Sequence, residues 1–98
     1  MAISYKAIQT DLAKIKQFYK TRRVLDDEQI DDFDEQLKLA CRYNKVMEHA
    51  PSDILDVYYH TYIQGMSKSE VNLKYWNVSD KYMQRLYSRL NGYLHKWL

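Results

Sequence analysis

The sequence predicts an all-α fold, in which an N-terminal antiparallel helical hairpin is followed by a unit of three helices. Two observations support this prediction. The 98 residues include only two glycines and one proline, so residues that break regular structure are scarce. Apolar residues also recur at alternating steps of three and four, the period of one helix face. The single proline, Pro51, separates a hairpin over residues 1–50 from a second unit over residues 51–98.

The first 50 residues predict two helices. One runs from Ser4 to about Lys20, with the apolar stripe Tyr5, Ile8, Leu12, Ile15 and Tyr19. After a break at residues 21–25, Asp26 or Asp27 can cap a second helix that continues to about His49. Its stripe consists of Ile30, Phe33, Leu37, Ala40, Asn44 and Met47. Such stripes can pair with each other within one chain or with a second copy of the chain. Residues 4–49 are therefore expected to form a helical hairpin that contacts another protein or forms a homodimer.

Seven carboxylates lie between Asp26 and Glu35. Negative charge at this position favours the start of a helix, because the first backbone N–H groups carry partial positive charge. The segment lacks the glycine and the alternating ligands of a calcium loop, so we expect no metal there.

Two polar residues of the second helix need separate interpretation. Cys41 lies beside the apolar stripe and is expected to be a small core residue, since a single cysteine cannot close an intramolecular disulfide. Asn44 occupies a stripe position, where a buried asparagine can specify register or oligomeric state. A surface or hydrogen-bonded asparagine is the alternative.

Residues 51–98 predict a helix, a turn, a short helix, a second turn and a long helix. Ser52 is expected to cap a helix that ends at Ile63 or Gln64, followed by a left-handed turn at Gly65. The apolar residues of this helix are Ile54, Leu55, Tyr58, Tyr59 and Tyr62.

Capping residues define the two helices that follow. Ser67 and Glu70 form an S-x-x-E capping box at the start of a short helix from Lys68 to about Tyr75. Asn77 can adopt positive φ in the next turn, with Val78 pointing inward, and Ser79 can cap a final helix towards Trp97. Its inward-facing residues are expected to be Met83, Leu86, Leu90, Tyr93, Leu94 and Trp97.

The stretch from Tyr62 to Val71, continued by Asn77-Val78-Ser79 and Met83-Gln84-Arg85-Leu86, resembles the helix-turn-helix of sigma-factor fourth regions. The whole chain resembles the ArpU- and RinA-type late-transcription regulators of Gram-positive phages, mainly over residues 51–98. Asn72 stands where such motifs carry a small residue, and one extra residue precedes Ser79. The turn is therefore expected to be altered, with Trp76 either filling the space or stacking on a partner.

This resemblance implies that the helix from Ser79 enters the major groove of DNA. Gln84 could then read adenine and Arg85 guanine through paired hydrogen bonds. The basic side chains expected at phosphates are Lys68, Lys74, Lys81 and Arg89. The full expected DNA-binding set is Lys68, Lys74, Ser79, Lys81, Gln84, Arg85, Ser88 and Arg89. The alternative interpretation of these residues is an ordinary solvated helix surface.

The expected function is a DNA-binding transcriptional regulator, encoded by a phage or mobile element. Its expected partners are double-stranded DNA and a protein of the transcription machinery or of phage regulation. The alternative is a small phage or pathogenicity-island inhibitor that keeps a helix-turn-helix shape but blocks a transcription factor or another protein. The near-neutral net charge of +2 permits both functions.

An enzyme is not expected, and neither is a cofactor or metal. His49, His60 and His95 fall on different predicted helices, and no glycine-rich phosphate loop or activated nucleophile accompanies them. No run of 18 apolar residues and no secretory leader is present, so the sequence predicts a cytoplasmic protein without a membrane partner.

Overall fold

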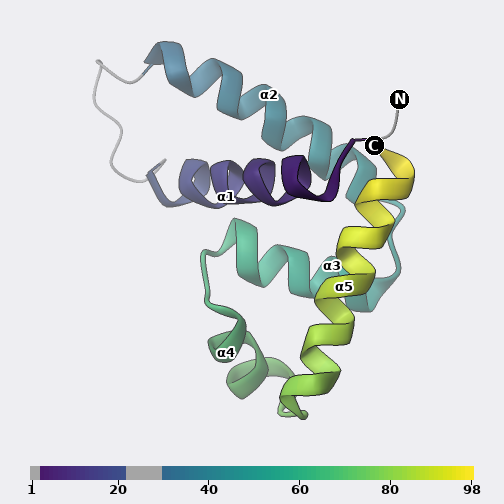
Figure 1. The fold of residues 1–98 in the computed structure, drawn as a ribbon. Coiled ribbons are helices and arrows are strands. Elements are labelled where there is room, and N and C mark those ends of the chain that lie inside the picture. The colour runs from purple at the N-terminus through teal and green to yellow at the C-terminus, as the bar shows by residue number, and fades with distance from the viewer. Residues whose placement is uncertain (1–2, 22–29) are drawn as a thin grey trace.

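The computed structural model describes residues 3–21 and 30–98, with side chains described for residues 3–20 and 35–98. Every regular element in these ranges is helical, which confirms the all-α class (Figure 1). The order is α1 (Tyr5–Thr21), α2 (Ile30–Met47), α3 (Ser52–Tyr58) with its π-helical continuation η3 (Tyr59–Ile63), α4 (Lys68–Val71) with its π-helical continuation η4 (Asn72–Trp76), and α5 (Asp80–Trp97).

Helix α1 begins one residue later than predicted, because Ser4 caps it from outside: its Oγ accepts from the Ala7 N–H at 3.1 Å. The predicted inward positions hold for the middle of the stripe. The inward position predicted for Tyr5 is wrong, because its side chain is 54% exposed and stacks on His95 of α5. Phe18 is buried instead, because η3 and α5 as well as α2 pack against α1 and widen its buried face. The buried residues are Ile8, Leu12, Ile15 and Phe18.

Helix α2 turns a slightly different face to the core than predicted. Tyr43 is fully buried, and its hydroxyl donates to Asp11 of α1 at 2.7 Å, so the large ring is buried with its polar atom satisfied. The buried stripe therefore runs through Ala40, Tyr43 and Met47. This rotation leaves Leu37 39% exposed and Cys41 on the surface, so the core positions predicted for these two residues are wrong.

The ends of α2 also bear on the prediction. The helix ends at Met47, two residues before His49. The expected cap at Asp26 or Asp27 lies outside the described residues, as do the side chains of Ile30 and Phe33 and most of the acidic segment.

The start of α3 corrects the predicted cap. Pro51, rather than Ser52, precedes the first helical turn, and no side-chain cap bond is made from it. Asp53 Oδ1 accepts from the Ile54 N–H at 2.8 Å and so satisfies one of the free donors of the first turn. Leu55 and Tyr59 were expected inside but are 38% and 44% exposed. The inward residues are Ile54, Val57, Tyr58, Thr61 and Tyr62.

The turns and serine caps of residues 65–79 follow the predictions, but only the Ser67 half of the predicted capping box is formed. Gly65 has φ 76° and Asn77 has φ 51°, both in the left-handed region. Ser67 Oγ accepts from the Glu70 N–H at 3.1 Å, and Ser79 Oγ accepts from the Tyr82 N–H at 3.2 Å. Both helices therefore begin at their predicted caps.

Helix α5 buries most of its predicted inward face. Tyr93 is half-buried, whereas Trp97 is 59% exposed, so its predicted inward position is wrong. Tyr87, which was not predicted inside, is buried because its hydroxyl lies 2.5 Å from that of Thr61 in η3. The buried residues of α5 are Met83, Leu86, Tyr87, Leu90 and Leu94.

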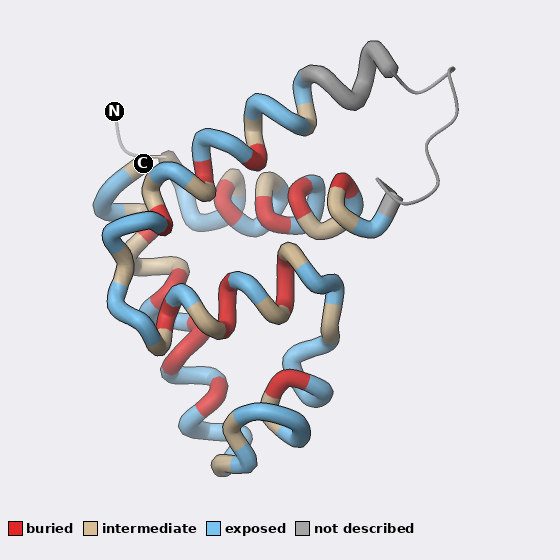
Figure 2. The backbone as a smooth tube through the Cα atoms, turned by 180° about the vertical axis from the view of Figure 1, so that it is seen from behind, coloured by how far each residue is buried: buried red, intermediate tan, exposed pale blue. Residues whose placement is uncertain are grey.

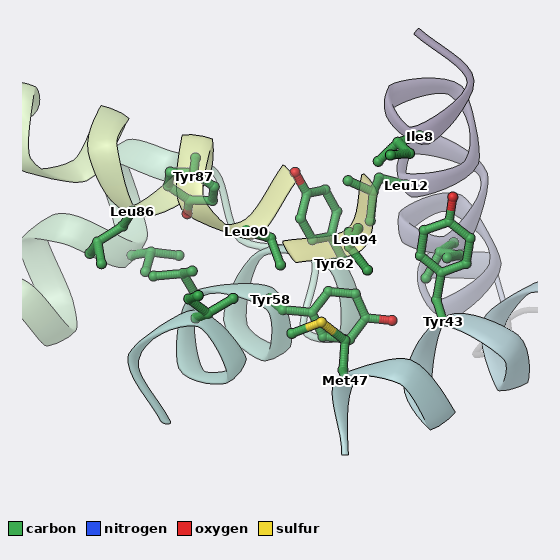
Figure 3. Close-up of a cluster of buried hydrophobic side chains, with 14 of the residues drawn as sticks. Ile8, Leu12, Tyr43, Met47, Tyr58, Tyr62, Leu86, Tyr87, Leu90 and Leu94 are labelled. Atoms are coloured by element: carbon green, nitrogen blue, oxygen red, sulfur yellow. The ribbon is translucent and has the colours of Figure 1, made fainter. Parts of the chain in front are cut away.

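One hydrophobic cluster joins residues from both sides of Pro51. Figure 3 shows side chains of this cluster from α1 (Ile8, Leu12), α2 (Tyr43, Met47), α3 and η3 (Tyr58, Tyr62) and α5 (Leu86, Tyr87, Leu90, Leu94). Few residues are buried far from this cluster. Helices α4 and η4 bury one residue, Val71, and the part of the molecule that they form is mostly exposed in Figure 2. The core thus includes residues of α5 from Met83 to Leu94, whereas α4 contributes only Val71.

Candidate nucleic-acid interface

The polar face of α5 gathers five of the eight predicted site residues on one surface. They line a shallow hollow of about 500 Å³. All five are exposed, because the buried positions of α5 fall on the opposite side of the helix. The lining residues are Lys81, Gln84, Arg85, Ser88 and Arg89.

A second hollow, of about 470 Å³, lies between α4 and α5 and adds Lys68 to this surface. Gln84 and Ser88 line both hollows, so the two hollows meet along α5. The residues of the second hollow are Lys68, Ser69, Asn72, Asp80, Met83, Gln84, Tyr87, Ser88 and Asn91. We call the exposed polar residues of the two hollows the α4–α5 polar surface: Lys68, Ser69, Asp80, Lys81, Gln84, Arg85, Ser88 and Arg89.

The aromatic ring of Tyr87 positions the ammonium group of Lys68. Its ammonium group lies 4.7 Å from the centroid of the Tyr87 ring, within the range of a cation–π contact. Burial raises the pKa of the Tyr87 hydroxyl, although the hydrogen bond with Thr61 lowers it in part. The phenol therefore stays neutral at ordinary pH, and the ring offers Lys68 a fixed, uncharged platform.

Arg89 already has a partner in the chain. Its guanidinium donates to Asp53 Oδ2 of α3 at 2.6 Å. Partial burial of Asp53 opposes ionisation, but the hydrogen bonds from Arg89 and from the Ile54 N–H, together with the positive charge of Arg89, outweigh it, and the pKa of this carboxyl is lowered. Since the pair is largely exposed, it contributes little stability, about 0–1 kcal/mol. A phosphate would have to compete with Asp53 for Arg89.

The remaining two predicted residues stand apart. Lys74 belongs to η4, lines neither hollow and lies with its ammonium 5.5 Å from the centroid of the Tyr75 ring. Ser79 uses its hydroxyl to cap α5. Lys74 and Ser79 were expected to share one surface with the α5 residues, but neither residue lines the two hollows.

Side-chain hydrogen bonds of Asn72 shape the turn between α4 and α5, while an alteration relative to the motif stays a prediction. Asn72 Nδ2 donates to the Val78 carbonyl and Asn72 Oδ1 accepts from the Val78 N–H, both at 2.8 Å. These two bonds close the turn with a side chain where a small residue would leave a gap. Trp76 Nε1 donates to Asp56 Oδ2 of α3 at 3.0 Å, which supports the space-filling interpretation of Trp76.

Sequence reasoning missed two side chains of the α4–α5 polar surface. Ser69 follows the first residue of α4, and Asp80 is the first residue of α5. Asp80 is absent from the expected DNA-binding set, and a carboxylate does not suit a phosphate backbone. Ser69 would have emerged from applying the helical period to the first turn of α4 as well as to α5.

Other kinds of site lack comparable support. Within the described residues, no three His, Cys, Asp or Glu side chains lie together as a metal-binding group. No helix in the same part of the chain has the length and apolarity needed to cross a bilayer. Comparison of the chain with family models, curated proteins and solved structures gave no match.

Proposed function

We propose that the protein is a DNA-binding transcriptional regulator that reads the major groove with α5. The observation that carries this proposal is the α4–α5 polar surface. It combines three cations of α5, the amide of Gln84 and, across the adjoining hollow, Lys68 of α4. An α-helix fits the major groove, and the helix before it commonly approaches the phosphates.

The amide and the cations of this surface match groups of a DNA duplex. The amide of Gln84 matches the N6 and N7 positions of adenine, and the guanidinium of Arg85 matches O6 and N7 of guanine. Lys68 and Lys81 supply charge for the phosphate backbone, which fixes orientation without reading sequence. Arg89 joins them once it exchanges Asp53 for a phosphate.

The test is fluorescence anisotropy of labelled duplexes chosen from a randomised pool, titrated with the full chain at several salt concentrations. With the three cations Lys68, Lys81 and Arg89 at phosphates, log K should fall by about 3 per tenfold rise in salt. Gln84→Ala and Arg85→Ala should each lower specific affinity by about 5- to 100-fold. Lys38→Ala, an exposed cation on α2, is the matched control and should change nothing. No detectable binding at about 50 mM salt would contradict the proposal.

The wider setting of the regulator is also a proposal. Origin in a phage or mobile element rests on the resemblance to ArpU- and RinA-type regulators. We propose action in the cytoplasm, without catalysis, and dimerisation through residues 4–49. Since most residues of the α1 and α2 stripes face the core, such a dimer would use the exposed stripe residues, including Tyr5 and Leu37.

Exposed apolar side chains of η3, η4 and α5 favour the second candidate function, an inhibitor of another protein. Leu73 is 79% exposed, and Tyr59, Tyr75 and Tyr82 are each 44% exposed. The His60 ring stacks on Tyr75 with centroids 3.8 Å apart, which joins η3 to η4. An inhibitor should retain one stoichiometric protein partner after nuclease treatment and lose it in Leu73→Asp, whereas Arg85→Ala should have no effect. If the protein is a DNA-binding regulator, Arg85→Ala should lower DNA affinity and Leu73→Asp should leave it unchanged.

A further inference from the structure

Asp80 is unusual among the aspartates whose side chains are described. Asp11 accepts from Tyr43, Asp53 from Arg89 and Asp56 from Trp76. Asp80 is exposed, and within residues 3–20 and 35–98 its carboxylate takes part in no hydrogen bond or ion pair. An ionised carboxylate without a partner therefore lies on the α4–α5 polar surface.

A carboxylate at this place must find a donor when DNA covers it. The phosphates and most major-groove atoms are acceptors or carry negative charge, so they repel an ionised aspartate. The groove offers two kinds of donor, the N4 amino group of cytosine and the N6 amino group of adenine. Aspartate and glutamate characteristically accept from cytosine N4.

Asp80 and Gln84 are four residues apart on α5 and line the same hollow, so they lie on the same helix face one turn apart. A base pair presented to Gln84 thus brings a neighbouring base pair to Asp80. Lys81, the next residue, is also exposed and lines the hollow on the other side of Gln84.

We propose that Asp80 is a specificity-determining residue, which accepts from the amino group of a cytosine next to the base read by Gln84. The proposal rests on the DNA-binding function above. Asp80 discriminates mainly by repulsion: any base that presents only acceptors leaves the carboxylate buried and unpaired, which weakens binding at wrong sites. The residue also favours the start of α5 electrostatically, but that local effect carries no base preference.

The experiment is selection of binding sites from a randomised duplex pool with the full-length wild type, Asp80→Asn, Asp80→Ala and the control Glu70→Gln. Glu70→Gln removes the same charge from the first turn of α4, outside both hollows. The wild type should enrich cytosine at one position by about fivefold or more. Both Asp80 variants should lose this preference, keep the positions assigned to Gln84 and Arg85, and bind unrelated DNA more tightly. Circular dichroism melts check that each variant is folded.

The outcomes separate the two proposals. If Asp80→Asn and Asp80→Ala select the same sequences as the wild type, Asp80 only supports the helix start and this inference is wrong while DNA binding stands. If Glu70→Gln loses the cytosine preference as well, overall charge rather than Asp80 sets it. If the wild type selects no sequence, the proposed function falls and this inference falls with it.

Discussion

At the scale of single residues, Asn44 connects three helices. Its Nδ2 donates to the Tyr19 hydroxyl of α1 at 2.8 Å, and its Oδ1 accepts from the Tyr58 hydroxyl of α3 at 2.7 Å. Tyr58 is only 1% exposed, so its hydroxyl depends on this acceptor. Of the interpretations open from the sequence, a hydrogen-bonded asparagine within one chain describes the structure.

Replacing Asn44 with Leu should therefore destabilise the fold. The Tyr58 hydroxyl would remain buried without its acceptor, which costs about 1–3 kcal/mol of unfolding free energy. Urea denaturation followed by circular dichroism measures the loss. Tyr58→Phe in the Asn44→Leu background should recover part of it, because the orphaned hydroxyl is then removed. Strictly additive effects of the two substitutions would show that this bond does not couple the helices.

At the scale of elements, the turn between α4 and α5 sets how the two helices of the α4–α5 polar surface meet. Asn77 takes the left-handed conformation, and Asn72 bridges to both backbone polar groups of Val78. Asn72 also lines the hollow between the helices, so the residue that closes the turn borders the candidate interface.

Asn72→Ala should lower stability by about 1–2 kcal/mol, since two hydrogen bonds are lost and the Val78 groups must turn to water. DNA affinity should fall as well, because Lys68 and Gln84 would no longer be held at a fixed separation. Urea denaturation and anisotropy measure the two effects. The control is Asn77→Gly, which keeps the positive φ and should alter stability by less than about 0.5 kcal/mol. Asn72→Ala with unchanged DNA affinity would mean that the turn does not position the surface.

Local signals explain which elements the sequence predicts well. The caps at Ser67 and Ser79 and the left-handed turns at Gly65 and Asn77 depend on neighbouring backbone atoms, and the structure confirms them. Their chemistry is complete within a few residues. The outward positions of α5 follow in the same way from the helical period alone.

Rotation of a helix about its axis depends on distant residues, and here the sequence misleads. Tyr43 rather than Leu37 is buried in the core, because Asp11 of α1 accepts a hydrogen bond from the Tyr43 hydroxyl. Trp97 is exposed although it continues the apolar stripe of α5. The double bond of Asn72 to Val78 likewise depends on the path of the turn between them. Such partners are known only once the helices are packed.

At the scale of the whole molecule, the shared core contains buried tyrosines beside its aliphatic side chains. Tyr43, Tyr58, Tyr62 and Tyr87 are at most 8% exposed. Burial raises the pKa of Tyr62 to about 12 and raises the pKa of Tyr43, Tyr58 and Tyr87 as well. Each phenol must stay protonated for the core to remain packed.

Stability should consequently fall at alkaline pH. Below pH 10, the ordinary tyrosine pKa, both folded and unfolded chains hold these protons, and the full contribution is present. Between pH 10 and about 12 the unfolded chain releases them while the folded chain retains them, so deprotonation favours unfolding. Each such tyrosine lowers the unfolding free energy by up to about 1.4 kcal/mol per pH unit in this window.

Urea denaturation at intervals from pH 8 to pH 11 tests this dependence. Tyr62→Phe removes one ionisable group from the core and should make the decline above pH 10 shallower by about one proton's share. Val57→Ala, which opens a cavity at a fully buried position, should lower stability by a similar amount at every pH and leave the slope unchanged. Because these rings join α1 and α2 to α3 and α5, one cooperative transition should report the whole decline. Equal slopes for wild type and Tyr62→Phe would mean that Tyr62 ionises as readily in the folded chain as in the unfolded one, and that the ring is not sealed in the core.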